Sequence, residues 1–240
     1  MKIALIGYGK MGKAIEEIAL QKGYEIVLKI NDENLADFTK ENLLKCDVAI
    51  EFTNPESAVE NMHICINAGV PVVCGSTGWV AQEDEIKKYC IEQNGALLYS
   101  SNFSIGVNIF FEINKRLAAL MAGQKGYNVS IEETHHTQKK DAPSGTAITI
   151  AQQIISERSD KNNWTLNPAV SAEEILIESK RIDPAPGTHQ VRYTSAIDDI
   201  EIIHTAHSRK GFAAGALAAA EFIAGKKGIF SMSDVLKTGI

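Results

Sequence analysis

The stretch Lys2-Ile3-Ala4-Leu5-Ile6-Gly7-Tyr8-Gly9-Lys10-Met11-Gly12 decides the fold of the first half of the chain. Its apolar run from Lys2 to Ile6 predicts a buried strand, and the apolar spacing from Ala14 to Ala19 predicts a helix after the glycines. Glu25 to Ile30 predicts a second strand. Together these segments form a unit of about thirty residues, the length expected of a βαβ crossover.

The same alternation continues through the first hundred residues. Further helices are predicted at 33–44, 55–68 and 81–94, and further strands at 47–52, 71–74 and 96–99. Strands that alternate with helices indicate a parallel sheet covered by helices on both faces. Ligands of such sheets bind beyond the carboxyl ends of the strands. At those ends the chain carries small and polar residues: Thr53-Asn54, Gly75-Ser76-Thr77-Gly78 and Ser100-Ser101-Asn102.

The pattern changes after Asn102, and the residues that follow predict a second domain of α+β type on a mixed or antiparallel sheet. Helices are predicted at 106–121 and 144–157, and strands at 128–133, 174–182, 188–196 and 199–204. The alanine-rich segment 211–225 predicts a closely packed helix. We expect a first domain of residues 1–103, onto which 209–240 pack back, and a second domain of residues 104–208.

Composition narrows the function class. With 240 residues and 45% hydrophobic content, the chain is expected to be a globular protein with a sizeable core. The formal net charge is −6 and no long Lys/Arg run occurs, which argues against nucleic-acid binding. The apolar run at the N-terminus is too short for a signal peptide or a membrane span, so we expect a cytoplasmic protein. The cysteines form no C-x-x-C pair and are expected to be reduced, mostly buried thiols: Cys46, Cys65, Cys74 and Cys90.

The glycines at the end of the first strand favour a dinucleotide site over a purely structural turn, because they follow a strand and open a helix. Gly7 allows the tight turn, Gly9 lets the backbone approach a pyrophosphate, and Gly12 permits close packing of the helix. The N-terminus of that helix attracts the phosphates.

Asp32 is the predicted partner of the adenosine ribose hydroxyls, with Asn31 as its competitor. A carboxylate there favours NADH over NADPH because it repels the 2′-phosphate, whereas Lys10 and Lys29 oppose that preference. Asp32 could equally be the cap of a helix that begins at Glu33.

A second concentration of polar residues runs from Glu133 to Ala147. Adjacent residues of a strand point to opposite faces, so at least one of His135 and His136 can have an ordinary packing or surface role. A lysine near imidazoles can act as a general acid near neutral pH, which makes Lys139 a predicted proton donor. Lys140 is expected to be a solvated charge.

The helix predicted after Pro143 offers an anion site at its start. Asp141 and Ser144 can cap this helix, which is a structural role. The backbone N–H groups of Gly145 and Thr146, with the hydroxyl of Thr146, can hold a substrate carboxylate. Both roles can hold at once, because they use different N–H groups.

Four further residues are given lesser roles. His204 and His207 form an H-x-x-H pair without a nearby Cys or Glu partner, so we expect structural roles and no metal site. Arg181 and Arg209 could steer an anionic substrate, although exposed arginines are commonly just solvated.

The motif residues His135-His136, Lys139 and 141–147 (Asp-Ala-Pro-Ser-Gly-Thr-Ala) resemble the signature of the 4-hydroxy-tetrahydrodipicolinate reductase (dihydrodipicolinate reductase) family of bacterial lysine and diaminopimelate synthesis. The resemblance extends over nearly the whole chain. It includes residues 7–12, 75–78, 100–108 and 209–236.

This resemblance implies a fold and a reaction. The fold is α/β, with an N-terminal Rossmann-like doubly wound parallel sheet and a second α+β domain whose open mixed sheet builds a homotetramer. The reaction is the reduction of a small cyclic dicarboxylic imine with NADH or NADPH, and no metal takes part.

The resemblance also assigns roles to individual residues. His135 and Lys139 are catalytic, with Lys139 as the proton donor, and the substrate is bound by His136, Ser144, Gly145 and Thr146. The residues implied in cofactor binding are Gly7, Tyr8, Gly9, Lys10, Met11, Gly12, Asp32, Gly75, Ser76, Thr77, Ser100, Ser101, Asn102 and Phe103.

The chain departs from the family pattern at three places. Gln138 stands where His or Asn is frequent, Asn31 with Asp32 stands at the cofactor-selecting acid, and Arg181-Ile182-Asp183 replaces an Arg-Gly-Gly region. Two alternatives stay open: another nicotinamide-linked reductase of an amino or keto acid, and a non-catalytic dinucleotide sensor. The sensor has no need of His135 and Lys139 beside an anion site.

Overall fold

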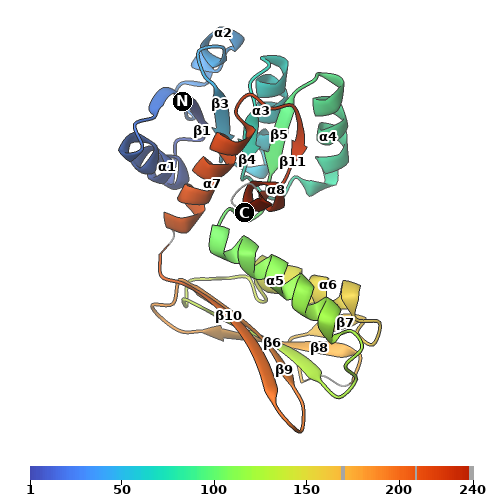
Figure 1. The fold of residues 1–240 in the computed structure, drawn as a ribbon. Helices are drawn as coiled ribbons and strands as arrows, with labels where there is room; N and C mark the ends of the chain where they lie inside the picture. Colours follow the sequence, from blue (N-terminus) through green and yellow to red (C-terminus); the bar gives the residue numbers. More distant parts are fainter. Residues whose placement is uncertain (169–170, 209, 238–240) are drawn as a thin grey trace. The chain divides into compact units, whose positions relative to one another are not determined.

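The structure is a computed structural model that describes residues 1–168, 171–208 and 210–237. The chain divides into two compact units, shown in Figure 1. One unit contains Met1–Ile105 and Lys210–Ile240, and the other contains Gly106–Arg209.

The first unit is built on a six-stranded parallel sheet with the strand order β11-β5-β4-β3-β1-β2. Its strands are β1 (Lys2–Ile6), β2 (Glu25–Ile30), β3 (Val48–Glu51), β4 (Val72–Cys74), β5 (Ala96–Tyr99) and β11 (Gly228–Phe230). Its α-helices are α1 (Lys10–Gln21), α2 (Lys40–Leu43), α3 (Pro55–Asn67), α4 (Glu83–Glu92), α7 (Lys210–Ile223) and α8 (Met232–Lys237). The parallel sheet expected from the alternation of helices and strands is confirmed.

Two hydrophobic cores lie on the two faces of this sheet. One face packs against α1, α7 and α8, and the other packs against α2, α3 and α4. The inner strands β1, β3, β4 and β5 are almost wholly buried, which explains why they read as continuous apolar runs in the sequence. The order of the strands reverses between β1 and β3, and a reversal of this kind is where doubly wound sheets bind their ligands.

The alanine-rich helix α7 packs at close range because it lacks large side chains on its buried face. A Cβ atom at Gly215 would lie 1.7 Å from the carbonyl oxygen of Phe103. Ala213, Ala216 and Ala220 are fully buried beside it. Small residues in this helix are therefore a packing requirement and not only a matter of helix propensity.

The second unit is a five-stranded mixed sheet with the strand order β10-β9-β6-β8-β7. Its strands are β6 (Asn128–His135), β7 (Asn163–Thr165), β8 (Glu174–Arg181), β9 (Gly187–Thr194) and β10 (Asp199–Ala206). The helices α5 (Ile105–Met121) and α6 (Gly145–Glu157) contribute to the core of this unit. β6 pairs in parallel with β8 and antiparallel with β9, so the sheet is mixed.

Two details of the second sheet were not predicted from the sequence. β8 and β9 follow each other in the chain but are not neighbours, because β6 lies between them. β6 also continues to His135, two residues beyond the predicted end at Glu133. This extension places His135 in the sheet.

The helix predicted over 33–44 is wrong. The chain forms a short 3-10 helix, η1 (Leu35–Asp37), and then the short helix α2. Side-chain hydrogen bonds interrupt a continuous helix here: Asn34 accepts from the Asn31 N–H at 2.8 Å, and it donates to the Lys29 carbonyl oxygen at 2.8 Å. Asparagine favours such local bonds over helix.

Three short elements were not expected from the sequence: β7, β11 and α8. A second 3-10 helix, η2 (Val80–Gln82), precedes α4. All four cysteines are buried and free, as predicted. Among the described residues, no helix has both the length and the apolar character needed to cross a membrane.

Candidate functional site

The glycines after β1 lie where the strand order reverses, and two of them have geometric reasons to be glycine. Gly7 has φ +94°, and a Cβ there would lie 2.0 Å from the carbonyl oxygen of Phe52, the residue that follows β3. A Cβ at Gly12 would lie 2.5 Å from the Gly7 carbonyl oxygen. Nothing lies within 4 Å of the Cβ position of Gly9, which leaves its backbone accessible to a ligand. This geometry fits a pyrophosphate at the start of α1.

Tyr8, within the same turn, belongs to a small charged cluster. Its hydroxyl donates to the Glu16 carboxylate, and the Lys29 ammonium lies 4.9 Å from the centroid of its ring. Lys29 also pairs with Glu16 at 2.5 Å. Part of the Lys29 charge is therefore already matched by Glu16. Lys10 is exposed at the first position of α1.

Asp32 lies exposed beyond the carboxyl end of β2. No helix begins at Glu33, so the alternative role of Asp32 as a helix cap is not observed. The side chain of the competing Asn31 accepts the Glu33 N–H at 2.9 Å. This bond makes Asn31 part of the turn, whereas Asp32 remains on the surface.

The segments after β4 and β5 lie beside the end of β3. A Cβ at Gly75 would lie 2.1 Å from the ring of Phe52, and Phe52 contacts Phe103 with ring centroids 5.7 Å apart. Ser76 is buried and Thr77 is exposed. In the segment 100–103, the Ser100 hydroxyl donates to the Asn102 carbonyl oxygen and accepts the Asn102 N–H, and Ser101 is exposed. Met11, at the start of α1, is half-buried.

A buried carboxylate, Glu51, fixes these strand ends, and the sequence analysis did not identify it. Its side chain accepts hydrogen bonds from the Thr53 N–H at 3.0 Å and from the Ser76 hydroxyl at 3.1 Å, and it contacts the Cys74 thiol at 3.0 Å. Glu51 is fully buried at the end of an otherwise apolar strand. An acidic residue at the end of an apolar strand is the feature of the sequence that could have indicated this role.

In the second unit, the buried face of β6 carries a carboxylate and a histidine. Along this strand Val129, Ile131, Glu133 and His135 are buried, as the alternation of strand side chains requires. Glu133 is fully buried, and His135 is 7% exposed. His136, the next residue, comes after the end of the strand and is half-buried.

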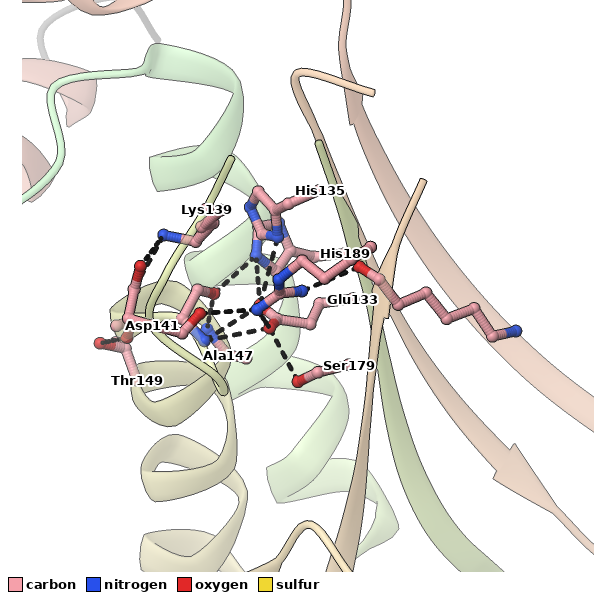
Figure 2. Close-up of polar contacts among 12 residues, drawn as sticks. Glu133, His135, Lys139, Asp141, Ala147, Thr149, Ser179 and His189 are labelled. Carbon is pink, nitrogen blue, oxygen red and sulfur yellow. Dashed lines mark hydrogen bonds and ion pairs between the residues drawn. The ribbon is translucent and has the colours of Figure 1, made fainter. Parts of the chain in front are cut away.

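Glu133 is the centre of a polar cluster in which three strands and the start of α6 meet (Figure 2). Its carboxylate accepts from the Ser179 hydroxyl at 2.8 Å and from Arg181 Nη2 at 3.2 Å, both from β8. It also lies 3.5 Å from His135 Nδ1 and 3.7 Å from Nε2 of His189, which is its direct neighbour on β9.

The start of α6 is bound to the same carboxylate. The backbone N–H of Ser144 lies 3.1 Å from both oxygens of Glu133. Ser144 is the N-cap residue, because its hydroxyl accepts the Ala147 N–H at 3.2 Å, and the helix begins at Gly145, one residue after the predicted start. Nothing lies within 4 Å of the Cβ position of Gly145, which leaves room for an anion. Thr146 follows it, half-buried.

Asp141 does not cap this helix. Its carboxylate instead binds Lys139, with both oxygens 2.8 Å from Nζ. Hydrogen bonding by Lys139 keeps the pKa of Asp141 below its ordinary value. Figure 2 shows this pair beside His135. Lys139 is partly buried and Lys140 is exposed.

The segment Arg181-Ile182-Asp183, where the chain departs from the family pattern, holds the loop that carries Lys139. Arg181 Nη2 donates to the Asp141 carbonyl oxygen at 2.6 Å. Asp183 accepts from the Thr137 N–H at 3.1 Å and from the Thr137 hydroxyl at 2.6 Å. Arg181 thus binds protein groups in this structure. Gln138, on the same loop, is exposed. Arg209 lies outside the described residues.

The charge states in this cluster follow from burial and hydrogen bonding. Burial raises the pKa of Glu133, but hydrogen bonds from Ser144 and Ser179 outweigh it and hold the pKa below its ordinary value. Burial lowers the pKa of His135 more than the Glu133 charge raises it. Burial also lowers the pKa of His189 to about 4. At neutral pH the cluster therefore holds one carboxylate and two neutral imidazoles.

The ligand atoms of Glu133, His135 and His189 lie within 4.8 Å of one another, and their types also suit a metal ion. The carboxylate oxygens, however, already accept hydrogen bonds from Ser144, Ser179 and Arg181. We therefore interpret the cluster as a hydrogen-bond network and not as a metal centre.

Outside this network, His204 contacts Phe110 with ring centroids 6.2 Å apart, and His207 is exposed. Sequence reasoning missed Glu133, Ser179 and His189. Glu133 was detectable as a charged residue at a buried position of the alternating strand. Ser179 and His189 become visible only when the strands are paired.

Sequence comparisons place the chain among known proteins. A sequence model described as "Dihydrodipicolinate reductase, N-terminus" matches residues 1–103, and one described as "Dihydrodipicolinate reductase, C-terminus" matches residues 106–236. The chain is 49% identical to a 4-hydroxy-tetrahydrodipicolinate reductase of Christiangramia forsetii, over 98% of both proteins. It is 39% identical to a protein of the same name from Methanosarcina barkeri, over 95% of the chain and 81% of that protein.

The fold is also similar to a solved structure. A dipicolinate-bound dihydrodipicolinate reductase from Paenisporosarcina sp. TG-14 superposes with a TM-score of 0.78, over 96% of this chain and 97% of that one, at 23% sequence identity. This similarity confirms the two sheets, parallel and mixed, as a known combination.

Proposed function

The chain belongs to the dihydrodipicolinate reductase family, and on that premise we propose how its residues carry out the reaction. The reaction is the NAD(P)H-dependent reduction of 4-hydroxy-tetrahydrodipicolinate to tetrahydrodipicolinate, in lysine and diaminopimelate biosynthesis. The N-terminal domain is a nucleotide-binding Rossmann domain.

The cofactor site is assigned to the turn after β1 and to the neighbouring strand ends. The N–H groups at the start of α1 would hold the pyrophosphate, with Gly9 allowing close approach. Asp32 would bind the adenosine ribose from its exposed position after β2. Residues 75–77 and 100–103 would border the nicotinamide. Bound there, NADH or NADPH would supply a hydride to the imine.

The substrate site is assigned to the start of α6 and the loop before it. Gly145 and Thr146 would bind one substrate carboxylate, supported by the Ser144 cap and the open space at Gly145. His136 would contact the substrate from the end of β6. A dicarboxylate needs positive charge or N–H donors at both ends, and Lys139 adds an ammonium close to this helix start.

Lys139 would deliver the proton. The 4-hydroxyl group of the substrate must leave as water, which gives an α,β-unsaturated imine. Addition of hydride to this imine leaves an enamine-like anion, which a positioned ammonium can both stabilise and protonate. The Asp141 carboxylate holds that ammonium by two contacts of 2.8 Å. His135, kept neutral by burial, would donate or accept a hydrogen bond beside it.

The assembly is proposed to be a cytoplasmic homotetramer formed through the second sheet. β10 ends this sheet, and Ile203 on it is 56% exposed; Ile197, in the turn before it, is 92% exposed. Exposed isoleucines at an open sheet edge are unfavourable in a monomer. Sedimentation equilibrium should give four times the mass of the chain, and the mass of one chain would contradict this part.

The observation that carries the proposal is that His135 and the start of α6 meet at one buried carboxylate, to which Arg181 connects the Lys139 loop. The test mixes the protein with NADH or NADPH and freshly generated 4-hydroxy-tetrahydrodipicolinate. Absorbance of the reduced nicotinamide should fall, and the two rates give the cofactor preference. No loss of absorbance with either cofactor would contradict the proposal.

A further inference from the structure

We propose that the ion pair of the buried Glu133 with the partly buried Arg181 positions both catalytic groups, His135 through Glu133 and Lys139 through Arg181 and Asp141. Neither member of the pair is assigned a direct contact with substrate. The inference rests on the roles proposed above for His135 and Lys139, and it adds two positioning residues to them.

The first arm connects Glu133 to His135. The two side chains lie on the same face of β6, two residues apart, and Glu133 Oε2 is 3.5 Å from His135 Nδ1. That nitrogen is buried and has no hydrogen-bond partner in this structure, so the carboxylate is the group it faces. A carboxylate there favours the tautomer with its proton on Nδ1, which leaves the lone pair on Nε2.

The His135 ring is also confined from its other sides. It meets the His189 ring edge-on, with centroids 5.1 Å apart. A Cβ atom at Gly187 would lie 3.1 Å from its Nε2, so the absence of a side chain there leaves space at that nitrogen. The ring therefore has one acidic neighbour on its own strand and packed groups from β9.

The second arm connects Arg181 to Lys139. The same guanidinium nitrogen, Nη2, donates to Glu133 at 3.2 Å and to the Asp141 carbonyl oxygen at 2.6 Å. Nη1 donates to the Lys180 carbonyl oxygen at 2.8 Å, which fixes the plane of the guanidinium. Asp141, held in this way, binds Lys139 Nζ with both carboxylate oxygens. A planar fork of donors is suited to such simultaneous contacts, and a lysine is not.

The pair also explains how an anion can be buried in a site for a dianionic substrate. An uncompensated carboxylate would repel the substrate and would be costly to bury. Arg181 neutralises it, and the Ser144 N–H and Ser179 hydroxyl complete its hydrogen bonds. The net charge of the pair is zero, so Glu133 adds no net negative charge to the site that receives the dianion.

The decisive variant is Glu133→Gln, which keeps the shape and removes the charge. We expect kcat to fall on the order of 10- to 100-fold, as for a misplaced catalytic group, with a much smaller change in KM. The charges that face His135 are Glu133 on β6, Lys139 and Asp141 on the loop, and Arg181 on β8, with the titratable His189 on β9. Only the first is changed.

Because the Glu133 charge raises the pKa of His135, its removal should move the midpoint of the His135 ring titration to lower pH. This midpoint is measured by NMR on histidine-labelled protein, with His135→Gln to assign the signal. A merely structural role would lower stability and leave the kcat of the folded variant near that of the unchanged protein.

The matched control is Glu132→Gln. Glu132 lies next to Glu133 but on the opposite face of β6, where it pairs with Lys180 of β8 at 2.8 Å. The variant removes the same charge from an ion pair between the same two strands. Its kcat and the His135 midpoint should stay close to those of the unchanged protein.

The second arm is tested by Arg181→Lys, which keeps the charge and loses the fork. We expect kcat to fall on the order of 10-fold, since Lys139 loses the support of its loop. This variant also carries the test if Glu133→Gln does not fold.

Three results would overturn the inference. One is Glu133→Gln with no shift of the His135 midpoint and with kcat within about twofold of the unchanged protein. A twofold change in kcat corresponds to less than the energy of one hydrogen bond. Another is normal turnover in Arg181→Lys. The third is one equivalent of zinc in the purified protein that is lost in Glu133→Gln. Absence of NAD(P)H oxidation by the unchanged protein would instead refute the proposed function, and the NMR titration would still test the first arm.

Discussion

The substitution His189→Gln tests whether the buried cluster makes stability depend on pH. His189 is 5% exposed, lies 3.2 Å from the Ser144 hydroxyl through Nε2, and has a pKa lowered by burial to about 4. An unfolded histidine titrates near 6.5. The folded state therefore favours the neutral ring, so its contribution is complete above the unfolded pKa and is lost as the pH falls from about 6.5 toward about 4.

The size of this loss follows from the two pKa values. With 6.5 in the unfolded state and about 4 in the folded state, protonation should remove about 2 kcal/mol of folding free energy between pH 7 and pH 5, and about 3 kcal/mol by pH 4. Glu133 at 3.7 Å acts in the opposite direction, but burial outweighs it. The side chain is nearly inaccessible, so solvent screening reduces the effect little.

The assay is unfolding by urea at pH 7 and at pH 5, followed through a signal of the tertiary structure of the second unit. The unchanged protein should lose about 2 kcal/mol more over this interval than His189→Gln, which has no group to protonate there. His207→Gln, which removes an exposed histidine, should show the pH dependence of the unchanged protein. Equal pH dependence in His189→Gln and in the unchanged protein would refute the reasoning.

Three further substitutions test packing and cofactor binding. Gly215→Ala should destabilise the protein by about 1–3 kcal/mol in thermal or urea unfolding although alanine favours helix, because its Cβ would lie 1.7 Å from the Phe103 carbonyl oxygen, whereas Gly211→Ala has ordinary space and should be neutral. Equal stability of the two variants would contradict this. In Gly12→Ala the new Cβ would lie 2.5 Å from the Gly7 carbonyl oxygen and would displace the turn, so NADH binding in a fluorescence titration should weaken by about tenfold or more. Asp32→Ser should raise NADPH turnover relative to NADH, and an unchanged ratio would exclude Asp32 as the ribose partner.

Periodicity and turn chemistry were sufficient to predict the parallel sheet of the first unit, because its inner strands are almost wholly buried and its longer helices have an apolar stripe. Short elements were missed. β11 has three residues and α2 has four, too few for a pattern to emerge. The helix over 33–44 was wrong because Asn34 makes local hydrogen bonds that compete with helix.

The part of the site whose residues are close in the sequence could be predicted. The part that strand pairing brings together could not. Lys139, Ser144 and Gly145 lie within one run of the chain. Glu133 lies near them in the sequence. Its importance, however, depends on Ser179 and His189, which reach it only through the register of β6 with β8 and β9. The pairing of Asp141 with Lys139, instead of capping by Asp141, depends on loop geometry that no spacing rule specifies.

The central claim, that Lys139 is the proton donor of a dihydrodipicolinate reductase, is tested most directly by comparing Lys139→Ala with Lys140→Ala. Both variants remove one lysine from the same loop, but Lys139 binds Asp141 beside His135 and Lys140 is exposed. Turnover of NADH with 4-hydroxy-tetrahydrodipicolinate should fall on the order of 10²- to 10⁴-fold in Lys139→Ala and stay near normal in Lys140→Ala. Near-normal turnover in Lys139→Ala would contradict the claim.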